Sequence, residues 1–307
     1  MLQSKLRILS AAILAACMLP LESIAQAALS EADLEALQRI PDDAPPVVMP
    51  AAGPYPVTLS ESPDLPDFTI YAPSPITGGR ERFAVVAWAN GGCANANADA
   101  REFLTTVASH GFVVIAPGAL DATEGGMTNS VVQIEALDWA ERENARQGGL
   151  LYGRIAADNA AVMGRSCGGL QSLENATDPR VRSVALFNSG ATEAVPEFLR
   201  GAVDFDKSDL AGLRTPIMYL IGGPVDPAWP NAEDDFTRID HVPLFNGNAQ
   251  TGHAGTFAHP GGGMQAGIAS RWLEWTLYGD AKAGRMFSGE NCGLCTDPVW
   301  RVKRKNM

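Results

Sequence analysis

The segment Ala161–Gly169, with the sequence AVMGRSCGG, constrains the fold of this chain more than any other feature. Its first half has the composition of a buried strand, and it runs into the pattern Gly164-x-Ser166-x-Gly168. The glycines are expected because bulky neighbours would clash in so sharp a turn from a strand into a helix. Such a turn lifts the Ser166 hydroxyl clear of the sheet and points the next backbone N–H toward the same place. The segment therefore predicts a strand, an exposed nucleophile and a helix, in that order.

Strand-like and helix-like segments alternate along most of the remaining chain. The strand candidates are short apolar runs, namely Val57–Ser60, Phe68–Tyr71, Phe83–Ala89, Phe112–Ala116, Ala160–Met163, Val184–Phe187, Ile217–Ile221 and Val242–Phe245. The helix candidates are Ala100–His110, Asn129–Arg146, Gly168–Ala176 and Met264–Leu277, with a break-rich stretch at Pro196–Leu213. This order predicts an α/β fold in which helices cover both faces of a mostly parallel sheet of about eight strands. Because only about 30 residues separate Phe187 from Ile217, we expect no large lid domain.

The N-terminal residues 1–27 have the pattern of a secretory signal peptide. Basic residues precede the mostly apolar stretch Ile8–Leu19, and Ala25-Gln26-Ala27 offers a small-residue cleavage site. A bacterial lipoprotein signal, with Cys17 as the lipidated residue, is the alternative. The apolar stretch is too short for a stable membrane span. Both alternatives predict an exported protein, periplasmic or extracellular.

The rest of the chain is predicted to form one α/β domain of residues 55–307 with a cysteine-containing tail. An irregular proline-rich lead-in of residues 28–54 precedes it. The net charge of −12 is scattered and argues against nucleic acid as a partner, because phosphates require a basic surface. No glycine-rich dinucleotide fingerprint follows a first strand. The sequence thus implies neither a metal nor a cofactor, and it leaves the oligomeric state open.

Four cysteines follow the N-terminal segment, and an exported protein can join them in disulfides. Cys292 and Cys295 lie close together in a loop-like tail, which favours a local bridge. A redox site would open a helix of a thioredoxin-type unit, and a zinc site would need a second ligand pair; the sequence has neither. Cys93 and Cys167 remain as a second candidate pair.

A carboxylate and an imidazole follow later strands, giving the order Ser, Asp, His. Asp226 stands in a turn after Ile217–Ile221, and His253 follows the last strand candidate. Loops at the carboxyl ends of parallel strands meet at one edge of a sheet, so we expect Ser166, Asp226 and His253 to come together there. An imidazole can take the serine proton and return it to a leaving group, while a carboxylate fixes its tautomer. The pattern predicts covalent catalysis by Ser166.

Several other residues could supply the base or the acid, namely His110, His241, His259, Glu193, Asp234 and Asp235. The first two histidines precede predicted strands and belong to the opposite edge of the sheet, which leaves His259 as the alternative to His253. The paired aspartates lie in what looks like the start of a helix, where carboxylates usually interact with the helix dipole. Glu193, after the preceding strand, is a second alternative acid.

The loop Asn90–Cys93 follows the strand candidate Phe83–Ala89 and contains two glycines. Backbone N–H groups from this loop and from Cys167, the residue after the nucleophile, are predicted to bind a developing oxyanion. Gly92 is the favoured donor of the loop, and Cys93 is the next. The alternative is a tight turn in which the glycines are needed only because the backbone adopts a positive φ there, with no role in binding an oxyanion. Donors that meet at one oxyanion would also bring Cys93 and Cys167 together.

With these motifs, about residues 55–280 resemble the α/β-hydrolase superfamily and, within it, the small lid-less esterases. This group includes dienelactone-hydrolase-like, chlorophyllase-like and cutinase or polyester-hydrolase-like enzymes. The resemblance lies in Asn90-Gly-Gly, the Ser166 turn, Gly222-Gly-Pro-Val-Asp226 and Gly252-His253. The tail Cys292–Trp300 is similar to the ends of a group of secreted hydrolases that share the N-G-G-C and S-C-G-G motifs. Cutinase-type turns usually carry His-Ser-Met, whereas this chain has Arg165-Ser166-Cys167.

Motifs and resemblance together predict an exported serine esterase that cleaves small-molecule or polymer-derived carboxylic esters through an acyl-enzyme. Amide or peptide cleavage by the same residues is one alternative, and a catalytically inactive hydrolase fold used for binding is another. A cysteine nucleophile, as in dienelactone-type enzymes, is disfavoured because Ser166 holds the apex of the turn. Of Trp88, Trp139 and Trp229, which could line a cleft or the core, Trp229 is the best cleft candidate because it follows Asp226 closely.

Overall fold

The computed structural model describes residues 31–39, 41–45, 52–76 and 81–307. A sheet with the strand order β1-β2-β4-β3-β5-β6-β7-β8-β9 forms its centre. The run from β4 to β8 is parallel, and β1, β2 and β9 join it in antiparallel pairs. The strands are β1 (Val57–Ser62), β2 (Leu65–Pro73), β3 (Phe83–Ala89), β4 (Phe112–Pro117), β5 (Ile155–Arg165), β6 (Val181–Phe187), β7 (Ile217–Ile221), β8 (Leu244–Asn248) and β9 (Arg301–Lys305). The predicted α/β fold with a mostly parallel sheet is confirmed.

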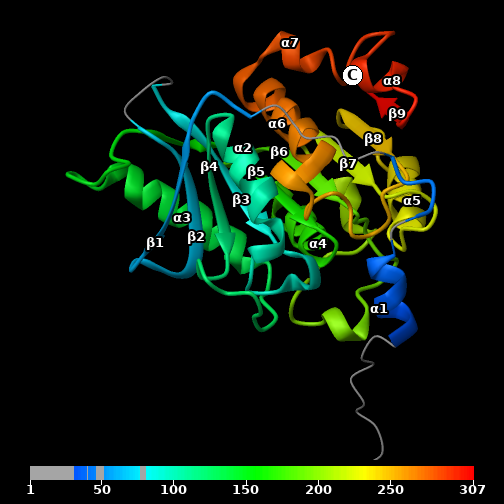
Figure 1. The fold of residues 1–307 in the computed structure, drawn as a ribbon, viewed down its shortest axis with the longest axis horizontal. Helices are drawn as coiled ribbons and strands as arrows, with labels where there is room; N and C mark the ends of the chain where they lie inside the picture. Colours follow the sequence, from blue (N-terminus) through cyan, green and yellow to red (C-terminus); the bar gives the residue numbers. More distant parts are fainter. Residues whose placement is uncertain (1–30, 40, 46–51, 77–80) are drawn as a thin grey trace, which may run out of the picture.

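Helices cover both faces of this sheet (Figure 1). The α-helices are α1 (Glu31–Gln38), α2 (Arg101–Ser109), α3 (Val131–Ala145), α4 (Cys167–Glu174), α5 (Trp229–Arg238), α6 (Gly263–Tyr278), α7 (Ala281–Gly284) and α8 (Gly293–Thr296). Short 3₁₀ turns are η1 (Gly91–Cys93), η2 (Ala98–Ala100), η3 (Asn175–Thr177), η4 (Glu197–Leu199), η5 (Asp209–Gly212) and η6 (Pro260–Gly262). The break-rich stretch predicted at Pro196–Leu213 contains two of these turns.

Strand β3 shows why the parallel strands have continuous apolar sequences. All of its residues are buried, and successive side chains point to opposite faces of the sheet. Val85 therefore joins the core beneath α3, α4 and α5, whereas Val86 joins the core beneath α2 and α6. A strand that is buried on both faces needs apolar residues at every position.

Helices α7 and α8 were not predicted from the sequence, and α5 begins earlier than expected. The expected helix start at Asp234 and Asp235 is wrong, because both residues lie inside α5, which begins at Trp229 with a proline in its first turn. The expected loop at Cys292–Cys295 is also wrong. These residues make one helical turn, in which the N–H of Cys295 donates to Cys292 Sγ at 3.1 Å.

With strand β9, the sheet in the described part of the chain has nine strands, one more than expected. It pairs with β8 at the edge of the sheet. Its sequence, RVKRK, lacks the apolar pattern by which strands are predicted. The Lys305 ammonium donates to the carbonyl oxygens of Phe236 at 2.5 Å and Ile239 at 2.9 Å. A cation is favourable there because the carbonyl groups at the C-terminal end of α5 lack partners within the helix.

The described part of the lead-in reaches the carboxyl edge of the sheet. A Cβ atom on Gly252 would lie 2.5 Å from the Arg39 carbonyl oxygen, so the lead-in packs against the loop before His253. The predicted signal peptide, residues 1–27 with Cys17, lies outside the described residues. Within the residues that are described, no helix is long and apolar enough to cross a membrane.

Candidate active site

Ser166 lies at the turn between β5 and α4, with φ 52° and ψ −121°. Such a positive φ is rare for a residue other than glycine, and only the surrounding packing can maintain it. A Cβ atom on Gly164 would lie 2.1 Å from the Gly168 carbonyl oxygen, and one on Gly168 would lie 2.1 Å from the Ala89 carbonyl oxygen. Close backbone contacts therefore require both glycines, which is the reason given for them from the sequence.

His253 lies between Ser166 and Asp226 and contacts both side chains. Its Nε2 is 2.9 Å from Ser166 Oγ, and its Nδ1 is 2.6 Å from Asp226 Oδ1. The three residues follow β5, β7 and β8, so the parallel sheet brings them to one edge. The Asp226 side chain is fully buried and that of His253 is 13% exposed. A base at this distance from a hydroxyl can accept its proton, and a buried carboxylate can hold the imidazole in one tautomer.

The Asp226 carboxylate accepts hydrogen bonds at both oxygens. Besides His253, Oδ1 accepts from the Ala228 N–H at 2.9 Å, while Oδ2 accepts from the Gly222 N–H at 3.0 Å and from Asn188 Nδ2 at 2.8 Å. Burial acts to raise the pKa of Asp226, but His253 and the two backbone N–H groups outweigh it and hold the pKa below its usual value. The carboxylate is thus ionised at neutral pH.

Two glycines let the loop of Asp226 and the loop of His253 pack directly together. The Gly252 N–H donates to the Gly222 carbonyl oxygen at 2.8 Å. A Cβ atom on Gly222 would lie 1.9 Å from the Gly252 carbonyl oxygen, and Gly252 itself has φ +66°. A side chain at either position would separate the acid from the imidazole.

The other three histidines have different surroundings. His110 Nδ1 lies 2.8 Å from Glu274 Oε1, and His241 Nε2 lies 3.0 Å from the Leu213 carbonyl oxygen. His259, the alternative considered from the sequence, has a buried Nδ1 with no hydrogen-bond partner within the described residues. The structure brings His253, and none of these three, into hydrogen-bond contact with Ser166.

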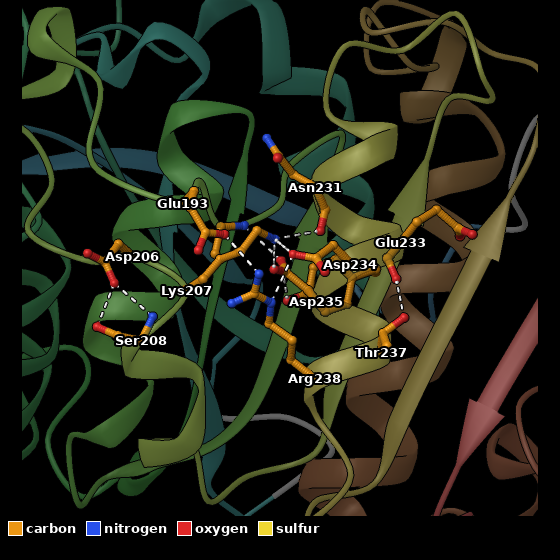
Figure 2. A network of polar contacts seen from close by, with 12 residues as sticks. Glu193, Asp206, Lys207, Ser208, Asn231, Glu233, Asp234, Asp235, Thr237 and Arg238 are labelled. Carbon is orange, nitrogen blue, oxygen red and sulfur yellow. Dashed lines mark hydrogen bonds and ion pairs between the residues drawn. The ribbon is translucent and has the colours of Figure 1, made fainter.

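The alternative acids belong to a separate polar network around Lys207 and Arg238 (Figure 2). The Lys207 ammonium lies 2.8 Å from Asp234 Oδ2 and 2.7 Å from Asp235 Oδ1. Arg238 binds Glu193 Oε2 at 2.8 Å. Burial raises the pKa of Asp235, although Lys207 acts in the opposite direction. This network joins α5 to the segment after β6, and His253 is not among its partners.

A disulfide between Cys93 and Cys167 joins the loop after β3 to the start of α4. A second disulfide joins Cys292 to Cys295, so both pairings considered from the sequence are confirmed. Gly92 has φ 63° and ψ 9°. The Cys93 N–H donates to the Asn90 carbonyl oxygen at 3.1 Å, whereas those of Gly92 and Cys167 have no backbone acceptor in the described part of the chain.

The three tryptophans differ in burial. Trp88 and Trp139 are core residues. Trp229 is partly exposed at the start of α5 and lines a cavity of about 360 Å³ together with Pro224 and Pro298. Of the three, Trp229 therefore fits best as a cleft residue, although neither Ser166 nor His253 is among the residues that line this cavity.

Sequence reasoning missed Asn188, which follows β6 directly. Its Nδ2 donates to Asp226 Oδ2 at 2.8 Å and to the Gly252 carbonyl oxygen at 2.9 Å. The signal that could have found it is its place at the carboxyl end of a parallel strand, the same position that identified Ser166 and Asp226. Asparagine also tolerates the φ of 50° found there.

Comparison with known families shows a match. A sequence model of the PETase family, described as PET hydrolase-like, matches residues 31–194, which is more than half of the 307-residue chain. The matched range contains Gly92, Ser166 and Cys167 and ends before Asp226 and His253. No curated protein matches the chain.

Proposed function

Since the chain belongs to the PET hydrolase-like family of α/β-hydrolases, it is an ester hydrolase, and we propose that it is an exported serine esterase. Its proposed nucleophile, base and acid are Ser166, His253 and Asp226. The observation that carries the proposal is the position of His253, with Nε2 2.9 Å from Ser166 Oγ and Nδ1 2.6 Å from Asp226 Oδ1. A nucleophile, a base and an orienting acid in this order are what acyl transfer requires.

The proposed reaction has two steps. Ser166 Oγ attacks the ester carbonyl carbon while its proton passes to His253 Nε2, and the tetrahedral intermediate collapses when His253 protonates the departing alcohol. Water then enters, loses a proton to His253 and attacks the acyl-enzyme, which releases the carboxylic acid and restores the serine. Asp226 stays ionised throughout, because its role is to orient the imidazole and stabilise the imidazolium.

The Gly92 and Cys167 N–H groups are the proposed oxyanion donors. Neither N–H group has a backbone acceptor among the described residues, which supports this choice, and the bond from the Cys93 N–H to the Asn90 carbonyl oxygen argues against Cys93 as the donor. The disulfide joins Cys167 to the residue directly after Gly92, so it limits how far the two donors can separate. Donors that are fixed before the charge develops stabilise it without reorganisation.

Small-molecule or polymer-derived carboxylic esters are the proposed substrates, with polyesters included because of the family. Two exposed apolar side chains near the site support an apolar ligand. Met127 pairs with Ala94, next to the proposed oxyanion loop, and Val225 precedes Asp226. Export and the division into a signal peptide (1–27), a lead-in (28–54) and a hydrolase domain (55–307) remain part of the proposal. The two disulfides support an oxidising compartment.

The test uses purified mature protein, the Ser166→Ala variant and a Ser288→Ala control. Ser288 is a suitable control because its hydroxyl donates to the Gly284 carbonyl oxygen, far along the chain from the site. The substrates are p-nitrophenyl esters of short and long acids and aminoacyl anilides, with a fluorophosphonate as a covalent label. We expect ester turnover and labelling by the wild type and the control, and a loss of at least about 10³-fold in Ser166→Ala.

Each negative result has a separate meaning. Absence of both turnover and labelling in the wild type would contradict the enzyme assignment and favour a binding role. Turnover of anilides alone would contradict the esterase assignment. Unchanged turnover in Ser166→Ala would show that another group is the nucleophile.

A further inference from the structure

Asn188 is a buried polar residue that the reaction described above does not use. It is fully buried directly after β6, and its φ of 50° is in the left-handed region. Buried side-chain amides are stable only when their hydrogen-bonding groups are satisfied. The partners of Asn188 therefore indicate what it is held in place to do.

Both ends of the Asn188 amide are engaged. Nδ2 donates to Asp226 Oδ2 at 2.8 Å and to the Gly252 carbonyl oxygen at 2.9 Å. Oδ1 accepts from Gln265 Nε2 at 3.1 Å, which fixes the orientation of the amide. Gln265 Oε1 in turn accepts a hydrogen bond from the Thr256 N–H at 2.7 Å. Asn188 thus connects the acid to Gly252 directly and to Thr256 through Gln265, and these two residues stand on either side of His253.

The oxygen that Asn188 contacts is not the one that faces the imidazole. His253 holds Oδ1 of Asp226, whereas Asn188 and the Gly222 N–H hold Oδ2. A carboxylate held at both oxygens cannot rotate about its terminal bond. Gly252 is also the residue directly before His253, so its carbonyl contact limits the movement of the base relative to the acid.

The next residue extends the connection to the nucleophile. Ser189 Oγ donates to the Ser166 carbonyl oxygen at 2.8 Å. A Cβ atom on Gly169 would lie 2.3 Å from Ser189 Oγ, so Ser189 packs directly against the start of α4. Two consecutive residues after β6 therefore contact all three loops of the site.

We propose that Asn188 is a positioning residue that fixes the Asp226 carboxylate and the His253 loop relative to each other. This inference rests on the proposed function, because it assigns Asn188 a role in orienting the proposed acid and base. Its amide also donates to the ionised carboxylate. His253 is the titratable side chain in contact with Asp226 among the described residues, and the other donors to Asp226 are neutral backbone groups.

Removal of this donor leaves the negative charge of Asp226 less compensated, and that charge then favours the imidazolium more strongly. The acid limb of the kcat/KM profile should move to higher pH for this reason. Replacement by aspartate should move it further at a pH where both carboxyl groups are ionised, because a second negative charge then faces Asp226. A residue with only a structural role would lower stability without moving this limb.

The experiment compares wild type with Asn188→Gly, Asn188→Asp and Asn175→Ala. Glycine accepts the positive φ, and aspartate preserves the shape and also tolerates that φ. Asn175 is the matched control, because it is a buried asparagine whose Nδ2 donates to the Ser130 carbonyl oxygen at 2.7 Å and to Gln133 Oε1 at 3.1 Å, away from the site. Thermal unfolding, kcat, KM and the pH profile on a p-nitrophenyl ester are measured for each protein.

We expect both Asn188 variants to lose about 10-fold to 100-fold in kcat with a change in KM below about twofold. The acid limb should move upward by about 0.5 pH unit in Asn188→Gly and by about 1 unit in Asn188→Asp. Asn175→Ala should be less stable than wild type, but its kcat and the pH of its acid limb should be unchanged.

An unmoved acid limb in a folded Asn188 variant, or kinetics that match those of Asn175→Ala, would overturn the inference. If Asn188→Gly does not fold, the near-isosteric Asn188→Asp decides alone. If neither variant folds while Asn175→Ala does, the role of Asn188 is structural and the inference is overturned. Failure of the proposed function would appear separately, as an inactive wild type or a fully active Ser166→Ala variant.

Discussion

The two disulfides allow one prediction to be worked through with an internal control. The perturbation is the double substitution Cys93→Ala and Cys167→Ala, and the control is Cys292→Ala with Cys295→Ala. The first bridge spans a sequence separation of 74 residues and the second a separation of 3. With the loop-closure entropy of the unfolded chain, these separations correspond to about 4.5 and about 2 kcal/mol of stabilisation. Removal of the Cys93–Cys167 bridge should therefore lower the free energy of unfolding by about 2.5 kcal/mol more than removal of the control bridge does.

The same pair of variants should differ in activity. Loss of the Cys93–Cys167 bridge frees the loop of Gly92 from the start of α4, so the proposed oxyanion donors lose their fixed separation. We expect kcat to fall by about 10-fold or more in this variant and by less than about twofold in the control. Urea unfolding gives the free energies, and ester turnover is measured where both variants are fully folded. Equal losses of stability in the two variants would refute the entropic argument, and an unchanged kcat would refute the role of the bridge at the oxyanion.

Three further predictions test the packing and the charges. Gly168→Ala should lower the free energy of unfolding by more than about 2 kcal/mol, because the new Cβ would lie 2.1 Å from the Ala89 carbonyl oxygen. Gly126 has open space around it, so Gly126→Ala should change the free energy of unfolding by less than about 0.5 kcal/mol. Urea unfolding measures both values. Lys207→Met should lower the free energy of unfolding by about 3–5 kcal/mol, because it leaves the Asp235 carboxylate buried without its cation. Arg200 belongs to an exposed ion pair, so Arg200→Ala should lower it by less than about 1 kcal/mol in the same assay. Because folding lowers the pKa of Asp226, its ionised form contributes stability that is complete above about pH 4 and is lost as the pH falls through the lower folded value. As the pH falls below about 4, Asp226→Asn should therefore lose less stability than wild type in urea titrations, and equal losses would contradict this.

The parts of the molecule that could be predicted are those governed by local rules. The Ser166 turn is encoded by two glycines and an apolar strand, and the loops of Asp226 and His253 could be placed because parallel strands all end at one edge. The order of the three residues then limited the choice among competing histidines and acids. Their assignment as catalytic groups stays a prediction until it is tested.

Other features depend on contacts that no local pattern encodes. The role of Asn188 requires Gln265, which lies 77 positions away, to orient its amide. The start of α5 at Trp229 was missed because acidic residues further along resembled a helix N-terminus. Helix α8 was missed because Cys292-Gly-Leu-Cys295 is short and contains a glycine, and a disulfide closes that single turn.

The basic strand β9 has a consequence for how this protein meets other copies of itself. An edge strand offers unpaired backbone groups on which a second sheet can grow. Four of the five residues of β9 are lysine or arginine. Lys303 is paired with Glu233, but two molecules that met along this edge would still bring cations of both strands close together. Their repulsion opposes edge-to-edge growth of the sheet, although the whole chain carries a net charge of −12. The sign of these charges thus disfavours the growth of the sheet beyond β9.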